Sequence, residues 1–175
     1  MPNALYTYVS DKDALLDAVL DDLLGDVVAQ VGEAEPWREA LIRILDASRR
    51  LLLDHPQLVP VFLSRPGLGR NAAILGETTF RLLRRAGLEG ERAVEAFRVL
   101  LIYTLGFAAF QAPRRQADSA ARTARGEAAF GSLPEDAFPE MRRVARYLAM
   151  HPSDENFQTG LRWLLDGMTS VKGGT

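Results

Sequence analysis

The chain has 175 residues, a formal net charge of −2 and a hydrophobic fraction of 47 %. This is an ordinary globular composition, long enough to bury a core, and it excludes a disordered or fibrous chain. The absence of cysteine excludes disulfides, thiol catalysis and cysteine-based metal sites. The chain opens without a signal-peptide pattern and holds no uninterrupted apolar stretch that fits a bilayer, so we expect a cytoplasmic protein with no membrane partner.

Apolar residues recur at three- and four-residue spacing along most of the chain, which predicts amphipathic helices. In chain order we expect helices from residue 14 to about 31, 36 to 54, 56 to 64, one through Ile74 and Leu83 that ends near Gly87, 93 to about 112, 139 to 150, and 154 to about 169. The sequence contains no run of alternating apolar and polar residues between turn residues, so it predicts no β-strand. The sequence therefore predicts an all-α fold of about eight helices.

The segment 93–112 is the most apolar of these helices and carries few charges. A helix that is apolar nearly all round must be covered on most sides. A chain of this size offers limited cover, so we expect an oligomer interface on this helix.

Residues 113–136 show no sustained period and are rich in Ala, Ser, Gly and Arg, so we expect a mobile loop with at most one helical turn. Residues 171–175 read as a frayed tail.

No arrangement of residues points to catalysis. The two histidines, His55 and His151, each precede a proline and do not form a helical metal-ligand pair. Asp154 and Glu155 are better explained as first-turn acids that complement a helix dipole than as metal ligands. Nucleophile-elbow, phosphate-loop and dinucleotide motifs are absent. We therefore expect no enzyme, no metal and no cofactor.

Aromatic residues distributed over three helices can enclose a small apolar ligand inside a helical bundle. The candidate pocket residues are Phe62, Arg65, Phe80, Tyr103, Phe107 and Phe110. The alternative for each aromatic is simple core packing, whereas the Tyr103 hydroxyl needs a polar partner if it is buried.

The stretch from Leu5 to Leu16, LYTYVSDKDALL, resembles the junction in TetR-family transcriptional regulators between the recognition helix and the next helix. The segments around Trp37, His55, Arg65 and Gly87, and the ending FQTGLRWLLDGM, are similar to the C-terminal domain of the tetracycline-repressor-like branch. The resemblance implies a TetR-like helical bundle with a helix-turn-helix remnant at residues 1–12, an effector-binding and dimerisation domain at residues 13–170, and a ligand-responsive regulator, most simply a repressor.

The resemblance also implies residue roles. Tyr6, Tyr8 and Lys12 fall where family members contact DNA, chiefly its phosphates, although Tyr6 and Tyr8 have the alternative of packing against other helices. The family forms a homodimer through a four-helix bundle, which places the interface on the helices 93–112 and 154–169. The interface candidates are Phe97, Leu101, Leu105, Phe157, Leu161, Leu164, Leu165 and Met168.

This chain departs from the family pattern because the first helices of the DNA-binding domain do not precede the junction, which suggests a cut at the start. We therefore expect operator DNA to be a partner only of a complete version, beside a second copy of the chain and a small-molecule effector. Two alternatives stay open: a headless ligand-binding or dominant-negative dimer partner, and a helical-bundle enzyme.

Overall fold

The computed structural model describes residues 12–29, 35–64, 69–115 and 119–170. Throughout these ranges the regular structure is helical, which confirms the all-α prediction. The helices are α1 (Lys12–Val28), α2 (Trp37–Asp54), the 3-10 helix η2 (Pro56–Leu58), α3 (Val59–Ser64), α4 (Arg70–Arg85), α5 (Gly90–Arg115), α6 (Ser119–Gly131), α7 (Pro139–Arg143), α8 (Ala145–Ala149) and α9 (Asp154–Ser170).

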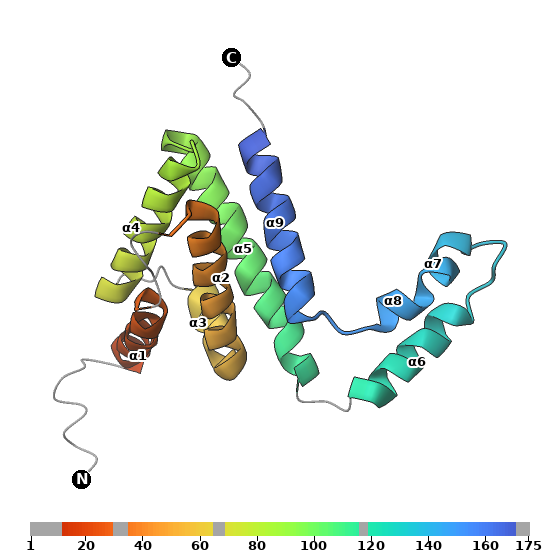
Figure 1. The fold of residues 1–175 in the computed structure, drawn as a ribbon. Helices are drawn as coiled ribbons and strands as arrows, with labels where there is room; N and C mark the ends of the chain where they lie inside the picture. The colour runs from red at the N-terminus through yellow and green to blue at the C-terminus, as the bar shows by residue number, and fades with distance from the viewer. Residues whose placement is uncertain (1–11, 30–34, 65–68, 116–118, 171–175) are drawn as a thin grey trace, which may run out of the picture.

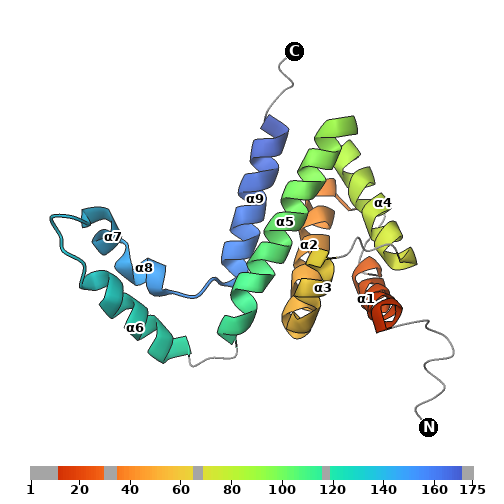
Figure 2. The ribbon, with the colours of Figure 1, turned by 180° about the vertical axis from the view of Figure 1, so that it is seen from behind.

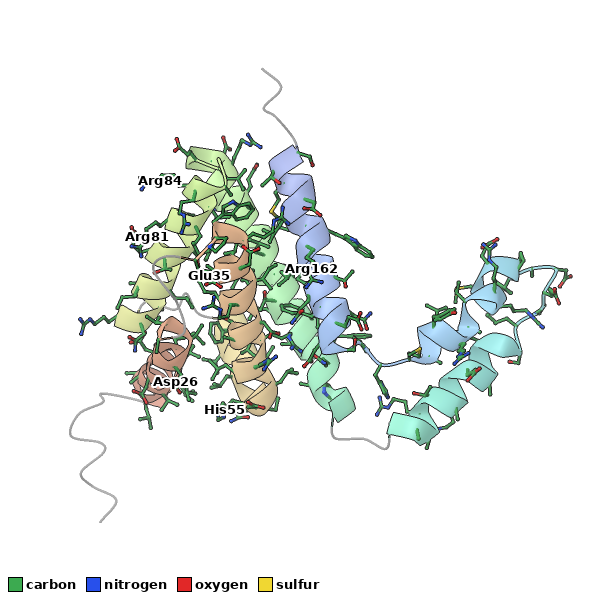
Figure 3. The ribbon with its side chains drawn as sticks, viewed as in Figure 1. Asp26, Glu35, His55, Arg81, Arg84 and Arg162 are labelled. Atoms are coloured by element: carbon green, nitrogen blue, oxygen red, sulfur yellow. The ribbon has the colours of Figure 1, made fainter. Side chains whose placement is uncertain are left out.

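Helices α1 to α5 and α9 form a bundle, and α6, α7 and α8 form an arm that extends from it (Figures 1 and 2). Helix α5 packs against α2, α4 and α9, and α1 packs against α4 and α2. Leu41, Leu83, Leu100, Phe157 and Leu161 are almost completely buried in the shared core. Charged side chains such as Arg81 and Arg84 point outward from α4 (Figure 3).

Helix α2 illustrates how the sequence positions the core. Leu41, Ile44 and Leu52 follow helical spacing and are at most 2 % exposed. The helix ends at Asp54, because His55 precedes Pro56 and a residue before proline is disfavoured in the α region. The next turn, η2, then redirects the chain toward α3.

Helix α5 is longer than predicted and includes Pro113 in its last turn. By length and composition alone, Gly90–Pro113 is long and apolar enough to cross a membrane, contrary to the prediction that no stretch of the chain fits a bilayer. In the structure this helix packs among α2, α4 and α9, and one third of its apolar window is buried there. It is thus the central helix of the bundle.

The prediction of a loop at 113–136 is wrong for Ser119–Gly131, which forms α6. This segment is rich in alanine, which favours a helix by intrinsic propensity without an apolar period. Helix α6 packs on α8, where Gly126 lets Ala149 approach closely. The helix predicted at 139–150 is divided into α7 and α8 at Val144, whose backbone is not helical.

Candidate ligand cavity

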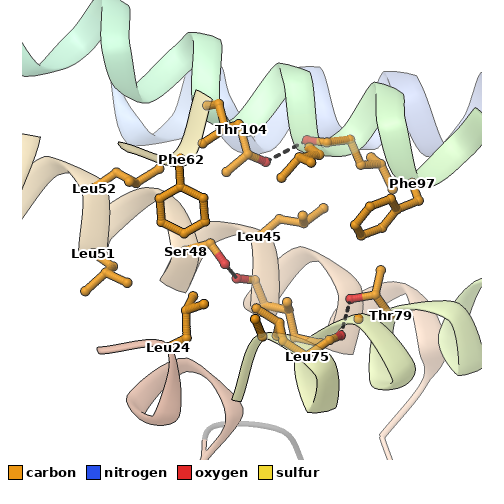
Figure 4. Close-up of a pocket in the computed structure, with 16 residues that line it drawn as sticks. Leu24, Leu45, Ser48, Leu51, Leu52, Phe62, Leu75, Thr79, Phe97 and Thr104 are labelled. Atoms are coloured by element: carbon orange, nitrogen blue, oxygen red, sulfur yellow. Dashed lines mark hydrogen bonds between the residues drawn. The ribbon is translucent and has the colours of Figure 1, made fainter. Parts of the chain in front are cut away.

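A cavity of about 380 Å³ lies between α1, α2, α3, α4 and α5 (Figure 4). Its walls are mostly aliphatic, with one aromatic ring from α3 and one from α5. The lining residues are Leu24, Ile44, Leu45, Ser48, Leu51, Leu52, Phe62, Ala72, Leu75, Gly76, Thr79, Phe97, Leu100, Leu101, Thr104 and Leu105. Ligand pockets in proteins have volumes of this order.

Three hydroxyl groups are the polar side chains of this lining, one each from α2, α4 and α5. Ser48 donates to the carbonyl of Ile44 at 2.9 Å. Thr79 donates to that of Leu75 at 2.7 Å, and Thr104 to that of Leu100 at 2.8 Å. Each hydroxyl proton is therefore held by the helix that carries it.

Helix α1 is fixed to α4 because a side chain of α1 caps the N-terminus of α4. The Asp21 carboxylate accepts hydrogen bonds from the backbone N–H groups of Asn71, at 3.2 Å, and Ala72, at 2.9 Å. The Asn71 side chain donates back to the Asp21 carbonyl at 2.9 Å. A Cβ at Gly69 would collide with the Asp21 side chain, so this approach requires glycine. The two helices that bound one side of the cavity are thus joined directly.

Replacing Asp21 by alanine is expected to lower the free energy of unfolding by about 1 kcal/mol, because two N–H groups at the start of α4 lose their acceptor. Urea denaturation measures the loss. The exposed neighbour Asp22 provides the matched control, and Asp22→Ala should change stability by much less. Equal losses in the two variants would contradict the capping role.

A buried cluster around Arg49 lies on the other side of α2. The Arg49 guanidinium, fully buried, donates to Asp46 at 2.7 Å, to Gln111 at 2.6 Å and to Asp154 at 3.0 Å. Its charge also lies 4.7 Å from the centre of the Phe157 ring. These contacts join α2, α5 and α9.

The hydrogen bond from Arg49 holds the pKa of Asp154 below its ordinary value, against the opposing effect of burial. Burial raises the pKa of Tyr103, and the Arg49 charge partly offsets this. The Tyr103 hydroxyl donates to the Phe157 carbonyl at 3.0 Å, so its predicted need for a polar partner is met. The Arg49 cluster therefore stabilises charged Asp154, whereas it is burial that favours the neutral form of Tyr103.

The lowered pKa of Asp154 predicts that the stability of the fold depends on pH. A carboxyl group whose pKa is lower in the folded state than in the unfolded state stabilises the folded state. This contribution is fully present above the pKa in the unfolded state, about 3.9, and is lost as the pH falls through the pKa in the folded state. Because the Asp154 side chain is 62 % exposed, Asp154→Asn should cost only a few tenths of a kcal/mol at neutral pH. Denaturation curves should show this difference vanish in strong acid, and a difference that persists there would contradict it.

The structure brings only some of the predicted pocket residues to the cavity. Phe62 lines it, and Phe80 stacks on the lining residue Phe97 with ring centres 5.0 Å apart. Tyr103 and Phe107 instead pack against Phe157 on the side of α9. Phe110 is 54 % exposed. Arg65 lies outside the described residues.

Sequence reasoning missed most of the cavity because leucines on α2 and α5 line it as they would line a core. The three hydroxyl residues on otherwise apolar helix faces were the available signal. No group of three or more His, Asp or Glu side chains suited to a metal occurs in the described part of the chain.

The predicted interface residues also lie mostly inside the chain. Phe157, Leu161 and Leu165 are fully buried in the core, and Leu164 and Met168 pack against it. Phe97, Leu101 and Leu105 line the cavity. Most of these residues contact their own subunit because they occupy the inward faces of α5 and α9, whereas Leu101 is also 36 % exposed.

Other residues carry the exposed apolar faces of the same two helices. On α5 these are Val99, Ile102 and Phe110, beside the predicted Leu101, with Ile102 69 % exposed; on α9 it is Trp163, which is 73 % exposed. Trp163 borders a shallow groove that Tyr103, Gly160 and Leu164 also line. Of the predicted DNA contacts, Lys12 begins α1, whereas Tyr6 and Tyr8 lie outside the described residues.

The fold and the cavity together define an all-helical domain built around a ligand-sized apolar chamber. A family model described as tetracyclin repressor-like, C-terminal domain, matches residues 32–171. An HTH-type transcriptional regulator of Saccharopolyspora erythraea is 29 % identical over 178 residues, which cover 97 % of this chain and 71 % of that protein. The HTH-type transcriptional repressor DrrR1 of Streptomyces coeruleorubidus is 30 % identical over 175 residues, which cover 94 % of this chain and 64 % of the repressor.

Solved structures agree. The apo form of ActR from Streptomyces coelicolor superposes with a TM-score of 0.83 at 30 % identity, covering 95 % of this chain and 78 % of ActR. ActR in complex with actinorhodin superposes with a TM-score of 0.82 at 28 % identity, covering 99 % of this chain and 83 % of ActR. The chain belongs to the tetracyclin repressor-like C-terminal domain family. It is a TetR-family transcriptional regulator, as the opening motif predicted.

Proposed function

We propose that this chain supplies the effector-binding and dimerisation part of a ligand-responsive repressor that acts in the cytoplasm without catalysing a reaction. The cavity between α1 and α5 is the observation that carries the proposal, because it is apolar, ligand-sized and bounded by helices that contact one another. ActR, which shares the fold, has been solved with actinorhodin.

The Asp21 cap supports a route for the signal. A ligand that contacts Ala72 and Thr79 on α4 would shift α1 through Asp21, and α1 would transmit this shift to a DNA-reading head. Such a ligand must bind the two states unequally. DNA contact by Tyr6, Tyr8 and Lys12 belongs to this proposal.

A second copy of the chain is the other proposed partner. The exposed residues Ile102 and Trp163 lie on the two helices that the family resemblance assigns to the dimer. An isologous interface would pair this face with itself. We propose this face in place of the buried residues named from the sequence.

Filling the cavity provides the test. Gly76 lines the cavity, and a Cβ there meets nothing within 4 Å, so Gly76→Leu can enter the space without displacing backbone. In a thermal-shift screen of apolar and aromatic metabolites, compounds that stabilise the native chain should lose their effect on Gly76→Leu. A ligand that binds only the folded state raises apparent stability.

Gly76→Ala is the matched control, because it also removes the low helix propensity of glycine but leaves the cavity open. It should retain the ligand response. A response of Gly76→Leu equal to that of Gly76→Ala would show that the ligand binds elsewhere.

A further inference from the structure

We infer that the cavity selects uncharged, largely apolar ligands that donate hydrogen bonds, such as phenols, and that it discriminates against carboxylates and against ethers of the same shape. The inference rests on the proposed function of the cavity as the effector site. It follows from the state of the three hydroxyl groups and from the position of the charges.

In the structure, the hydroxyl groups of Ser48, Thr79 and Thr104 are already engaged as donors. A hydroxyl has one proton and two lone pairs, and each of these protons is donated to a carbonyl one helical turn earlier, at 2.9, 2.7 and 2.8 Å. What these lining groups have left for a ligand is their oxygen lone pairs. A ligand group that pairs with them must therefore bring its own proton.

The three hydroxyls also come from different sides of the cavity. Figure 4 shows Ser48, Thr79 and Thr104 on separate helices, with the rings of Phe62 and Phe97 on two sides of the space between them. An aromatic body between the rings would bring a substituent near one or another acceptor. Recognition then depends on the donor and tolerates several positions for it.

No charged side chain lines the cavity in the described part of the chain. The buried cation on the opposite side of α2, Arg49, already pairs with Asp46 and Asp154. A ligand carboxylate would lose its hydration without gaining a charged partner, and an unpaired buried charge is costly. The cavity therefore disfavours anions.

Three matched probes test this with the full chain: 2-naphthol, its methyl ether 2-methoxynaphthalene, and 2-naphthoate, titrated by calorimetry near neutral pH. We expect 2-naphthol to bind about three- to tenfold more tightly than the ether, the range for one added hydrogen bond. We expect 2-naphthoate to bind at least about a hundredfold more weakly than 2-naphthol.

Variants localise the effect. In Ser48→Ala/Thr79→Val/Thr104→Val, the preference for naphthol over the ether should fall to about one. Thr169→Val is the control, because the Thr169 hydroxyl donates to the Leu165 carbonyl in the same way but lies outside the cavity lining. That variant should keep the native preference.

The outcomes separate the two proposals. If the ether binds as tightly as naphthol, or if naphthoate binds best, the inference on ligand class is overturned while the cavity remains the binding site. If none of the probes binds, the inference on ligand class is likewise overturned. If Gly76→Leu binds them as the native chain does, the proposed function of the cavity fails, and this inference fails with it. The comparison of the three probes on the native chain tests the inference even if the triple variant does not fold.

Discussion

Replacing Arg49 by alanine is expected to lower the free energy of unfolding by about 3 kcal/mol, because removing one partner of a buried ion pair leaves the other uncompensated. Asp46 and Gln111 are less than one tenth exposed, and both would lose the guanidinium. Asp46 retains Arg50 at 3.0 Å, which limits the loss. Guanidinium denaturation followed by circular dichroism measures the effect.

The neighbouring residue gives a control for this prediction. Arg50 also pairs with Asp46, but its side chain is 61 % exposed, so Arg50→Ala should cost less than about 1 kcal/mol. The double variant Arg49→Met/Asp46→Leu should regain much of the lost stability, because apolar residues of similar size can replace a buried ion pair. An Arg49→Ala loss no larger than that of Arg50→Ala would contradict the role of the Arg49 cluster.

A glutamate at Ile102 is expected to weaken the proposed dimer at least about a hundredfold, because an isologous interface would bury two unpaired charges. Ile102 is 69 % exposed in the single chain, so Ile102→Glu should leave the fold of each subunit intact. Sedimentation equilibrium at micromolar concentration should show a dimer for the native chain and a monomer for the variant.

Ile74 on α4 provides the matched control for this interface. It is the same residue type, is 37 % exposed, and belongs to a helix that lies away from α9 (Figure 1). Ile74→Glu should remain dimeric. A native chain that is monomeric, or equal weakening by both substitutions, would contradict the proposed face.

The sequence predicted the helices that have a clear apolar period, and it missed the one that lacks it. Helix α6 forms by alanine propensity and by packing on α8, and neither produces a stripe of apolar residues. The same limit applies to the faces of α5. A helix that is apolar nearly all round gives no local sign of which side meets α2, the cavity or solvent.

The Arg49 cluster could not have been predicted from local pattern. Arg49 and Arg50 are adjacent and chemically identical, yet one is fully buried and the other is mostly exposed. The difference comes from partners 62 and 105 residues further along the chain, Gln111 and Asp154. Family resemblance identified the domain, but only the packed structure assigns these roles.

Helix α2 has two faces with separate tasks. Ile44, Ser48 and Leu52 face the cavity, whereas Arg49, which also pairs with Asp46, anchors the helix to α5 and α9. Under the proposed function, substitutions on the first face change which compound is recognised, while the second face keeps the scaffold in place. This separation makes the domain a favourable starting point for evolving or engineering a sensor with a new specificity.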